Sequence, residues 1–200
     1  MHSETRQRLM DTAERLFAEK GFYGVSIAAI ASEMSFTKQA LLHYFKSKER
    51  LYAEILQRIS DDFQDQQQEA LLASDDPVER LKHFYTVLAE PTEANTRRTR
   101  LLMRELLDNN ARAEKATNWY LKEFLERLIS MVKAVESLRT LSDEDALIFA
   151  YQLLGAVNYY LISPSTLCGI FGKEVMEKMS ANFSVELDLL IAGRVQAVGK

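Results

Sequence analysis

The stretch between Phe36 and Glu49 reads "FTKQALLHYFKSKE" and carries side chains that can bind a polyanion. It holds three lysines and a histidine, and its only acidic residue is the last letter. The hydroxyl of Thr37 and the amine of Lys38 could reach phosphates, and the amide of Gln39 could pair with adenine through two hydrogen bonds. Periodicity alone favours a simpler alternative, a solvated amphipathic helix that binds nothing.

Two short helices joined by a tight turn are expected to position these side chains. Ser26 and Thr37 are suitable N-caps for the two helices, and "SF" at 35–36 forms the turn between them. A longer helix over residues 5–20, ended by Gly21, precedes the pair. This order predicts a helix-turn-helix whose second helix presents its N-terminal residues to the major groove. The inward-facing residues of the pair would be Ile27, Ile30, Ala31, Met34, Ala40, Leu41 and Phe45.

Residues 16–52, "LFAEKGFYGVSIAAIASEMSFTKQALLHYFKSKERLY", resemble the DNA-binding domain of TetR-family transcriptional regulators. The matching features are "LF" and "KG" at the end of the first helix, the serine that opens the second, and "HYFKSKERL" between the third and fourth. The resemblance implies that the DNA-binding residues are Ser26, Thr37, Lys38, Gln39, Leu42, His43, Tyr44 and Lys48. Ser26 and Lys48 would bind DNA phosphates. Thr37, Lys38 and Gln39 would lie at the major groove, and His43 and Tyr44 would lie along the DNA backbone.

Two positions depart from the family pattern. Ser35 occupies the turn position that is usually glycine, where a left-handed conformation would cost about 1 kcal/mol. Leu42 replaces the usual aromatic residue before "HYF", so it could contact a thymine methyl group but cannot donate to a phosphate. Both departures concern the details of DNA readout.

Charge is distributed unevenly along the 200 residues. The whole chain has a formal charge of −4, but residues 1–50 hold 8 Lys or Arg and 6 Asp or Glu, a net charge of +2. If a polyanion binds this chain, the N-terminal part is therefore where it is expected. The single cysteine, Cys168, cannot form an internal disulfide, and the N-terminus has no apolar segment of the kind found in signal peptides, which together predict a cytoplasmic protein.

The spacing of apolar residues and caps predicts an all-α protein of about nine helices. After a long helix that begins at Ser47 and fades into "DDFQDQQQEA", helices are expected near 76–90, 95–107, 114–138, 142–162 and 173–195. The predicted organisation is a helix-turn-helix DNA-binding domain over residues 1–50 and a larger helical effector-binding and dimerisation domain over residues 51–200. The apolar run 146–162 contains Gln152 and Asn158, which indicates burial in protein and not in lipid.

The family resemblance implies that the C-terminal helices form a homodimer and a pocket for a small, largely apolar effector. The run 146–162 and the last helix are the candidate dimer surfaces. Gln152 and Asn158 are the most informative pocket candidates, because a buried amide needs a hydrogen-bonding partner. Ordinary core packing is the alternative for the apolar candidates. The candidate ligand-binding residues are Phe84, Met103, Trp119, Tyr120, Phe124, Gln152, Asn158 and Tyr159.

The function expected is that of a ligand-responsive regulator, a repressor that leaves a palindromic double-stranded DNA operator when the effector binds. An activator remains an alternative, as does a helical protein-interaction module without DNA binding. Catalysis is not expected, because the three histidines are dispersed and neither a phosphate loop nor a nucleophile elbow is present. No cofactor, metal or membrane is expected as a partner.

Overall fold

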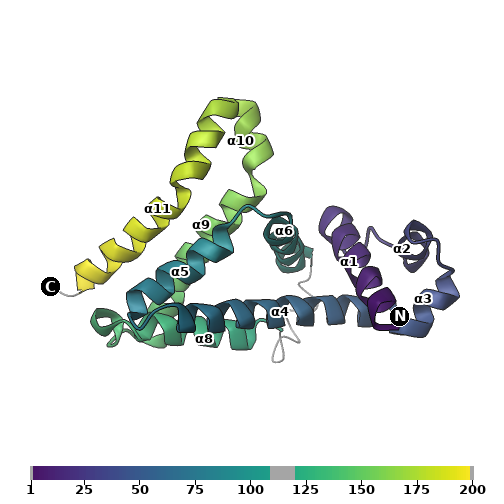
Figure 1. Ribbon diagram of the computed structural model, residues 1–200, viewed down its shortest axis with the longest axis horizontal. Coiled ribbons are helices and arrows are strands. Elements are labelled where there is room, and N and C mark those ends of the chain that lie inside the picture. Colours follow the sequence, from purple (N-terminus) through teal and green to yellow (C-terminus); the bar gives the residue numbers. More distant parts are fainter. Residues whose placement is uncertain (1, 109–119, 199–200) are drawn as a thin grey trace. The chain divides into compact units, whose positions relative to one another are not determined.

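The computed structural model describes residues 2–108 and 120–198 (Figure 1). Every regular element of these residues is a helix and none is a strand, which confirms the all-α prediction. The ten α-helices of the described residues are α1 His2–Lys20, α2 Ile27–Glu33, α3 Lys38–Phe45, α4 Lys48–Ala73, α5 Pro77–Ala89, α6 Glu93–Asp108, α8 Lys122–Lys133, α9 Asp143–Ile162, α10 Pro164–Phe171 and α11 Lys173–Val198. One 3-10 helix, η2, spans Glu136–Leu138.

Side-chain caps begin many of these helices where the sequence placed them. Ser26 Oγ accepts a hydrogen bond from Ala29 N at 3.0 Å, and Thr37 Oγ1 accepts one from Ala40 N at 3.1 Å. The Asp76 carboxylate caps α5 in the same manner, with Pro77 in the first turn. Each cap satisfies a backbone N–H that the helix itself cannot pair, so the start of the helix is encoded locally.

Three helices differ from the predictions. α4 does not fade in the polar run "DDFQDQQQEA" but continues to Ala73. The helix expected over 114–138 ends at Lys133, and its expected beginning lies outside the described residues. α9 ends at the break expected at "SPS", residues 163–165, but the additional short helix α10 begins there, because Pro164 occupies a first-turn position where its missing N–H costs nothing.

The chain folds into two compact units. The first comprises Met1–Asp61 and Thr96–Tyr120, and the second comprises Asp62–Asn95 and Leu121–Lys200. The units therefore divide α4 and place most of α6 with the first three helices. The boundary predicted from the sequence lies after residue 50, and the assignment of separate functions to its two sides stays a prediction.

Arginine contacts attach α6 to α1 within the first unit. Arg97 Nε donates to the Glu14 carboxylate at 2.8 Å, and Arg104 donates to the Ala18 and Glu19 carbonyls at 3.0 and 2.9 Å. Glu14 also binds Arg58 of α4, so one carboxylate joins three helices. Burial alone would lower the pKa of Arg58, but the Glu14 and Asp11 carboxylates outweigh it, and its pKa is raised.

The second unit is built around α5, which packs against α8, α9 and α11. Tyr85 is fully buried and donates its hydroxyl to the Ala150 carbonyl at 3.1 Å, and burial raises its pKa. Tyr160 of α9 stacks on Phe183 of α11 with 3.8 Å between ring centroids. α10 connects the ends of α9 and α11 (Figure 1).

Helix α9 has one buried face and one exposed face. Of the helices that the structure describes, it alone has the length and hydropathy required to cross a membrane, and 39% of its most apolar window is buried in the protein. Its buried residues include Ala146, Phe149, Leu153 and Val157, the spacing of a helix packed on a core. Packing within the second unit therefore accounts for the apolar residues on the buried face of α9, and Ile148, Tyr151 and Tyr159 remain exposed.

Candidate nucleic-acid interface

Helix α3 presents the polar side chains of the predicted reading helix. Leu41 and Phe45, one turn apart, are buried and hold the helix against the rest of the first unit, as predicted. The opposite side exposes Lys38, Gln39 and His43, and the capping residue Thr37 is exposed as well. No acidic residue lies in the first turn, so nothing there would repel a phosphate.

Helix α2 braces α3 through a tight turn. Ile27, Ile30 and Ala31 are buried, as predicted, whereas Met34 and Ala40 are only partly buried. Ser35 has a φ of 59°, the left-handed conformation expected of this position. Phe36 N donates to the Ala31 carbonyl at 2.8 Å, which closes the turn.

Lys48 makes contacts within the protein that the sequence did not predict. Its Nζ donates to the carbonyls of Phe22 and Val25 at 3.0 and 3.1 Å, and it lies 4.2 Å from the centroid of the Phe22 ring. An ammonium group has three N–H donors, so one remains for a phosphate. Lys48 therefore holds the loop between α1 and α2, and its phosphate contact stays a prediction.

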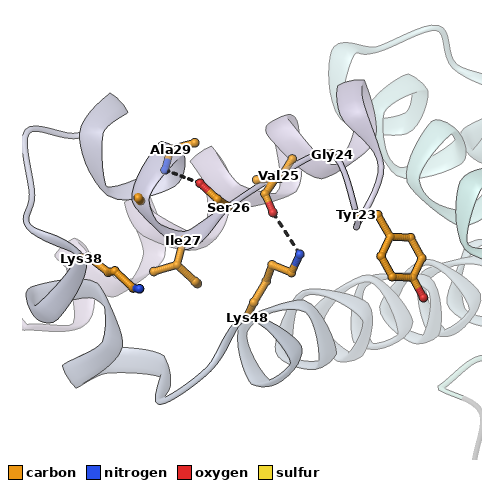
Figure 2. Close-up of a pocket in the computed structure, with 9 residues that line it drawn as sticks. Tyr23, Gly24, Val25, Ser26, Ile27, Ala29, Lys38 and Lys48 are labelled. Carbon is orange, nitrogen blue, oxygen red and sulfur yellow. Dashed lines mark hydrogen bonds between the residues drawn. The ribbon is translucent and has the colours of Figure 1, made fainter.

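An open hollow of about 500 Å³ is lined by Lys38 and Lys48. Figure 2 shows Lys38 from α3 and Lys48 from the start of α4 directed toward it, with Ser26 between them and Tyr23 at its end. The positive charges and hydroxyl groups suit a phosphate chain. Tyr23, which is 73% exposed, was not predicted as a site residue, because only the folded loop places it here.

The other predicted DNA-binding residues lie on the same helix with less exposure. Leu42 and Tyr44 are each partly buried. The Tyr44 ring contacts the rings of both neighbouring residues, His43 and Phe45. The structure thus brings the α3 residues together on one helix and adds Ser26 and Lys48 at the hollow. Their contacts with DNA stay a prediction.

The predicted ligand-binding residues are dispersed. Phe84 and Phe124 are buried with ring centroids 6.2 Å apart in the second unit, while Met103 and Tyr120 belong to the first unit and are partly buried. Trp119 lies outside the described residues.

On α9, the expectation of two buried amides is wrong for Gln152, which is exposed, and Asn158 is only partly buried. Tyr159 is exposed on the same helix. Their outward direction follows from the helical period, because the inner face of α9 is already occupied by its buried apolar residues.

Comparison with known proteins agrees with this geometry. Residues 9–55 match the family described as bacterial regulatory proteins, tetR family. Over these residues the chain is similar to the TetR family. The HTH-type transcriptional regulator YerO of Bacillus subtilis is 47% identical over 49 residues, which are 24% of this chain and 17% of that protein. The match to YerO therefore spans only a small part of either protein, so it says nothing of the remainder of this chain.

Longer matches extend the likeness to the rest of the chain. The HTH-type transcriptional repressor NicS of Pseudomonas putida is 22% identical over 179 residues, covering 88% of this chain and 84% of that protein. A protein from Saccharomonospora viridis, solved in complex with choline, has the same fold with a TM-score of 0.67, 24% identity and coverage of 90% and 95%. The named relatives are transcriptional regulators and not enzymes. Among residues 2–108 and 120–198, no group of His, Cys, Asp or Glu could hold a metal ion.

Proposed function

We propose that this TetR-family protein is a cytoplasmic, homodimeric transcriptional repressor that releases its operator when a small, largely apolar molecule binds. The observation that carries the DNA-binding part is the exposed polar side of α3, which is supported by Leu41 and Phe45 and has no acidic residue in its first turn. The hollow with Lys38, Lys48 and Ser26 supplies the phosphate contacts that fix the helix in register on the duplex.

Dimerisation is proposed through the exposed apolar faces of α9 and α11. Ile148, Tyr151 and Tyr159 on α9, together with Leu189 and Leu190 on α11, are each at least half exposed. Apolar groups of this size gathered on two helices favour burial against a second copy. A symmetric dimer presents two reading helices to half-sites about 34–36 Å apart, so the operator would be palindromic.

Effector release follows from a two-state equilibrium. A molecule that binds better to the conformation with misplaced reading helices lowers DNA affinity by the coupling free energy, typically about 1–3 kcal/mol. The choline bound to the fold relative from Saccharomonospora viridis supports a small-molecule site in proteins of this fold.

DNA binding is tested by fluorescence anisotropy with labelled duplexes selected from random sequence. A repressor of this kind enriches a palindrome and loses affinity steeply as salt rises, because bound counterions are released. A helical interaction module without DNA binding would enrich no sequence and show no salt-dependent retention.

A further inference from the structure

Gln67 in the second half of α4 has a buried amide with a fixed orientation. The residue is 1% exposed, and its Nε2 donates to the Phe124 carbonyl at 3.1 Å. Because a carbonyl can only accept, the amide nitrogen must face Phe124 and the oxygen must face away from it. Gln67 Oε1 is buried and has no hydrogen-bonding partner within the described structure.

The surroundings of Gln67 are aromatic. Phe63 precedes it by one helical turn on the same face of α4, and the Phe63 and Phe124 ring centroids are 4.9 Å apart. A buried acceptor without a donor costs the folded state free energy, which the hydrogen bond from the same amide's Nε2 to the Phe124 carbonyl offsets in part. A donor from outside the chain, a water or a ligand, would remove this cost, as it would for Gln66 Oε1, which is also buried without a partner in the described structure.

The chemistry of that partner follows from the hydrogen bonds that neighbouring side chains already make. Tyr85, which contacts Phe84 in the same aromatic cluster, has one O–H donor and gives it to Ala150. A carboxylate or phosphate has no hydrogen to donate and would be repelled by a bare carbonyl oxygen. A hydroxyl or an ammonium group donates, and the remainder of such a molecule can be apolar enough to contact phenylalanine rings.

We propose that the effector of this regulator carries a hydrogen-bond donor, a hydroxyl or an ammonium group, and that Gln67 Oε1 accepts it. This inference rests on the proposed function, since it specifies the class of molecule that releases the DNA. Effectors whose only polar group is a carboxylate are excluded. The sequence did not reveal the residue, because Gln67 lies in the polar run "DDFQDQQQEA" among glutamines that look alike.

Three probes with one tail and different head groups test the assignment on the full chain. Octan-1-ol and octylammonium should raise the Tm of the wild-type protein, and octanoate should not. In Gln67→Leu the Kd for the stabilising probes should weaken roughly tenfold, which is the loss of one hydrogen bond. Gln68→Leu, which changes an exposed glutamine on the same helix, should bind the probes like wild type. Gln67→Met, with an unbranched side chain, serves if the leucine variant does not fold.

The outcomes separate the head-group assignment from the regulator itself. Equal stabilisation by octanoate, equal affinity in Gln67→Leu, or no shift with octanol and octylammonium would each overturn the proposed donor. Binding to duplex DNA is measured on the same samples without probes. If the wild-type protein without probes shows no salt-dependent DNA binding, the proposed function as a regulator is wrong, whatever the head-group result.

Discussion

At the scale of single residues, Gln39 is the side chain of α3 best suited to read a base. Its amide is exposed one position after Lys38, at the N-terminal end of the helix. A bidentate pair with adenine discriminates against other bases by about 1–3 kcal/mol. Gln39→Ala should therefore relax sequence preference at one operator position while leaving non-specific affinity nearly unchanged, as measured by anisotropy with single-base operator variants. A uniform loss at every position would contradict direct readout by this residue.

Lys48 combines two roles that one substitution can reveal. Lys48→Ala removes the hydrogen bonds to Phe22 and Val25 and the proposed phosphate contact. It should weaken binding to all DNA sequences about equally, reduce the salt slope by about 1, and lower the free energy of unfolding by about 1 kcal/mol. Lys20→Ala, at an exposed lysine that ends α1, is the control. Unchanged stability in Lys48→Ala would show that the carbonyl contacts contribute little.

The carboxylate of Asp188 on α11 predicts a pH-dependent stability. Burial raises its pKa, the neighbouring Lys82 opposes this and Glu79 reinforces it, and Oδ1 has no hydrogen-bonding partner in the described structure. An acid whose pKa is raised by folding is destabilising above that pKa, and the penalty disappears as pH falls toward the unfolded value. Asp188→Asn should raise the Tm at neutral pH by on the order of 2 °C.

The advantage of Asp188→Asn should shrink as the pH is lowered, because the wild-type carboxyl then becomes protonated in the folded state. Glu186→Gln, at an exposed position on α11, provides the control and should show neither the gain nor its pH dependence. A gain that is constant with pH would mean that ionisation of Asp188 is not its cause. Thermal unfolding scans at a series of pH values measure both effects.

At the scale of helices, the attachment of α6 depends on Glu14. Its side chain is 4% exposed and binds Arg58 and Arg97 from two other helices. Removing one partner from a buried ion pair leaves the other charges uncompensated. Glu14→Ala should lower the free energy of unfolding by about 3 kcal/mol, whereas Glu19→Ala, which breaks an exposed pair with Arg15, should cost under about 0.5 kcal/mol. Urea unfolding measures both, and similar losses would contradict the burial argument.

How far each element could be predicted depends on how local its cause is. Ser26, Thr37 and Asp76 cap their helices through atoms two or three residues away, and the sequence located all three. The attachment of α6 to α1 joins Arg97 to Glu14, 83 positions apart, and no local pattern contains that pairing. α10 was missed because a proline and two serines in "SPS" are compatible with both a break and a new helix start.

The same distinction holds for the candidate sites. The exposed side of α3 follows from one helical period, so Lys38, Gln39 and His43 were identified from sequence. Burial within the C-terminal helices depends on which neighbour covers which face. The sequence therefore placed Gln152 inside when it is exposed, and overlooked Gln67, which is buried.

At the scale of the whole molecule, the proposed function requires two copies of the chain. DNA affinity from one half-site is multiplied when a linked second helix binds the other, a gain of roughly a hundredfold or more in bivalent systems. Leu189 is 59% exposed on α11 and lies on the proposed dimer face. A glutamate there would place a charge in an apolar interface.

Leu189→Glu should therefore be monomeric by native mass spectrometry and bind a palindromic operator roughly a hundredfold more weakly, with affinity for an isolated half-site preserved. The preserved half-site affinity follows because α3 and its supporting core are not touched by the change. Leu72→Glu, which introduces the same charge at an exposed leucine near the end of α4, should remain dimeric and bind like wild type. A Leu189→Glu protein that is still dimeric would remove α11 from the interface, and a monomer with unchanged operator affinity would show that one reading helix is enough.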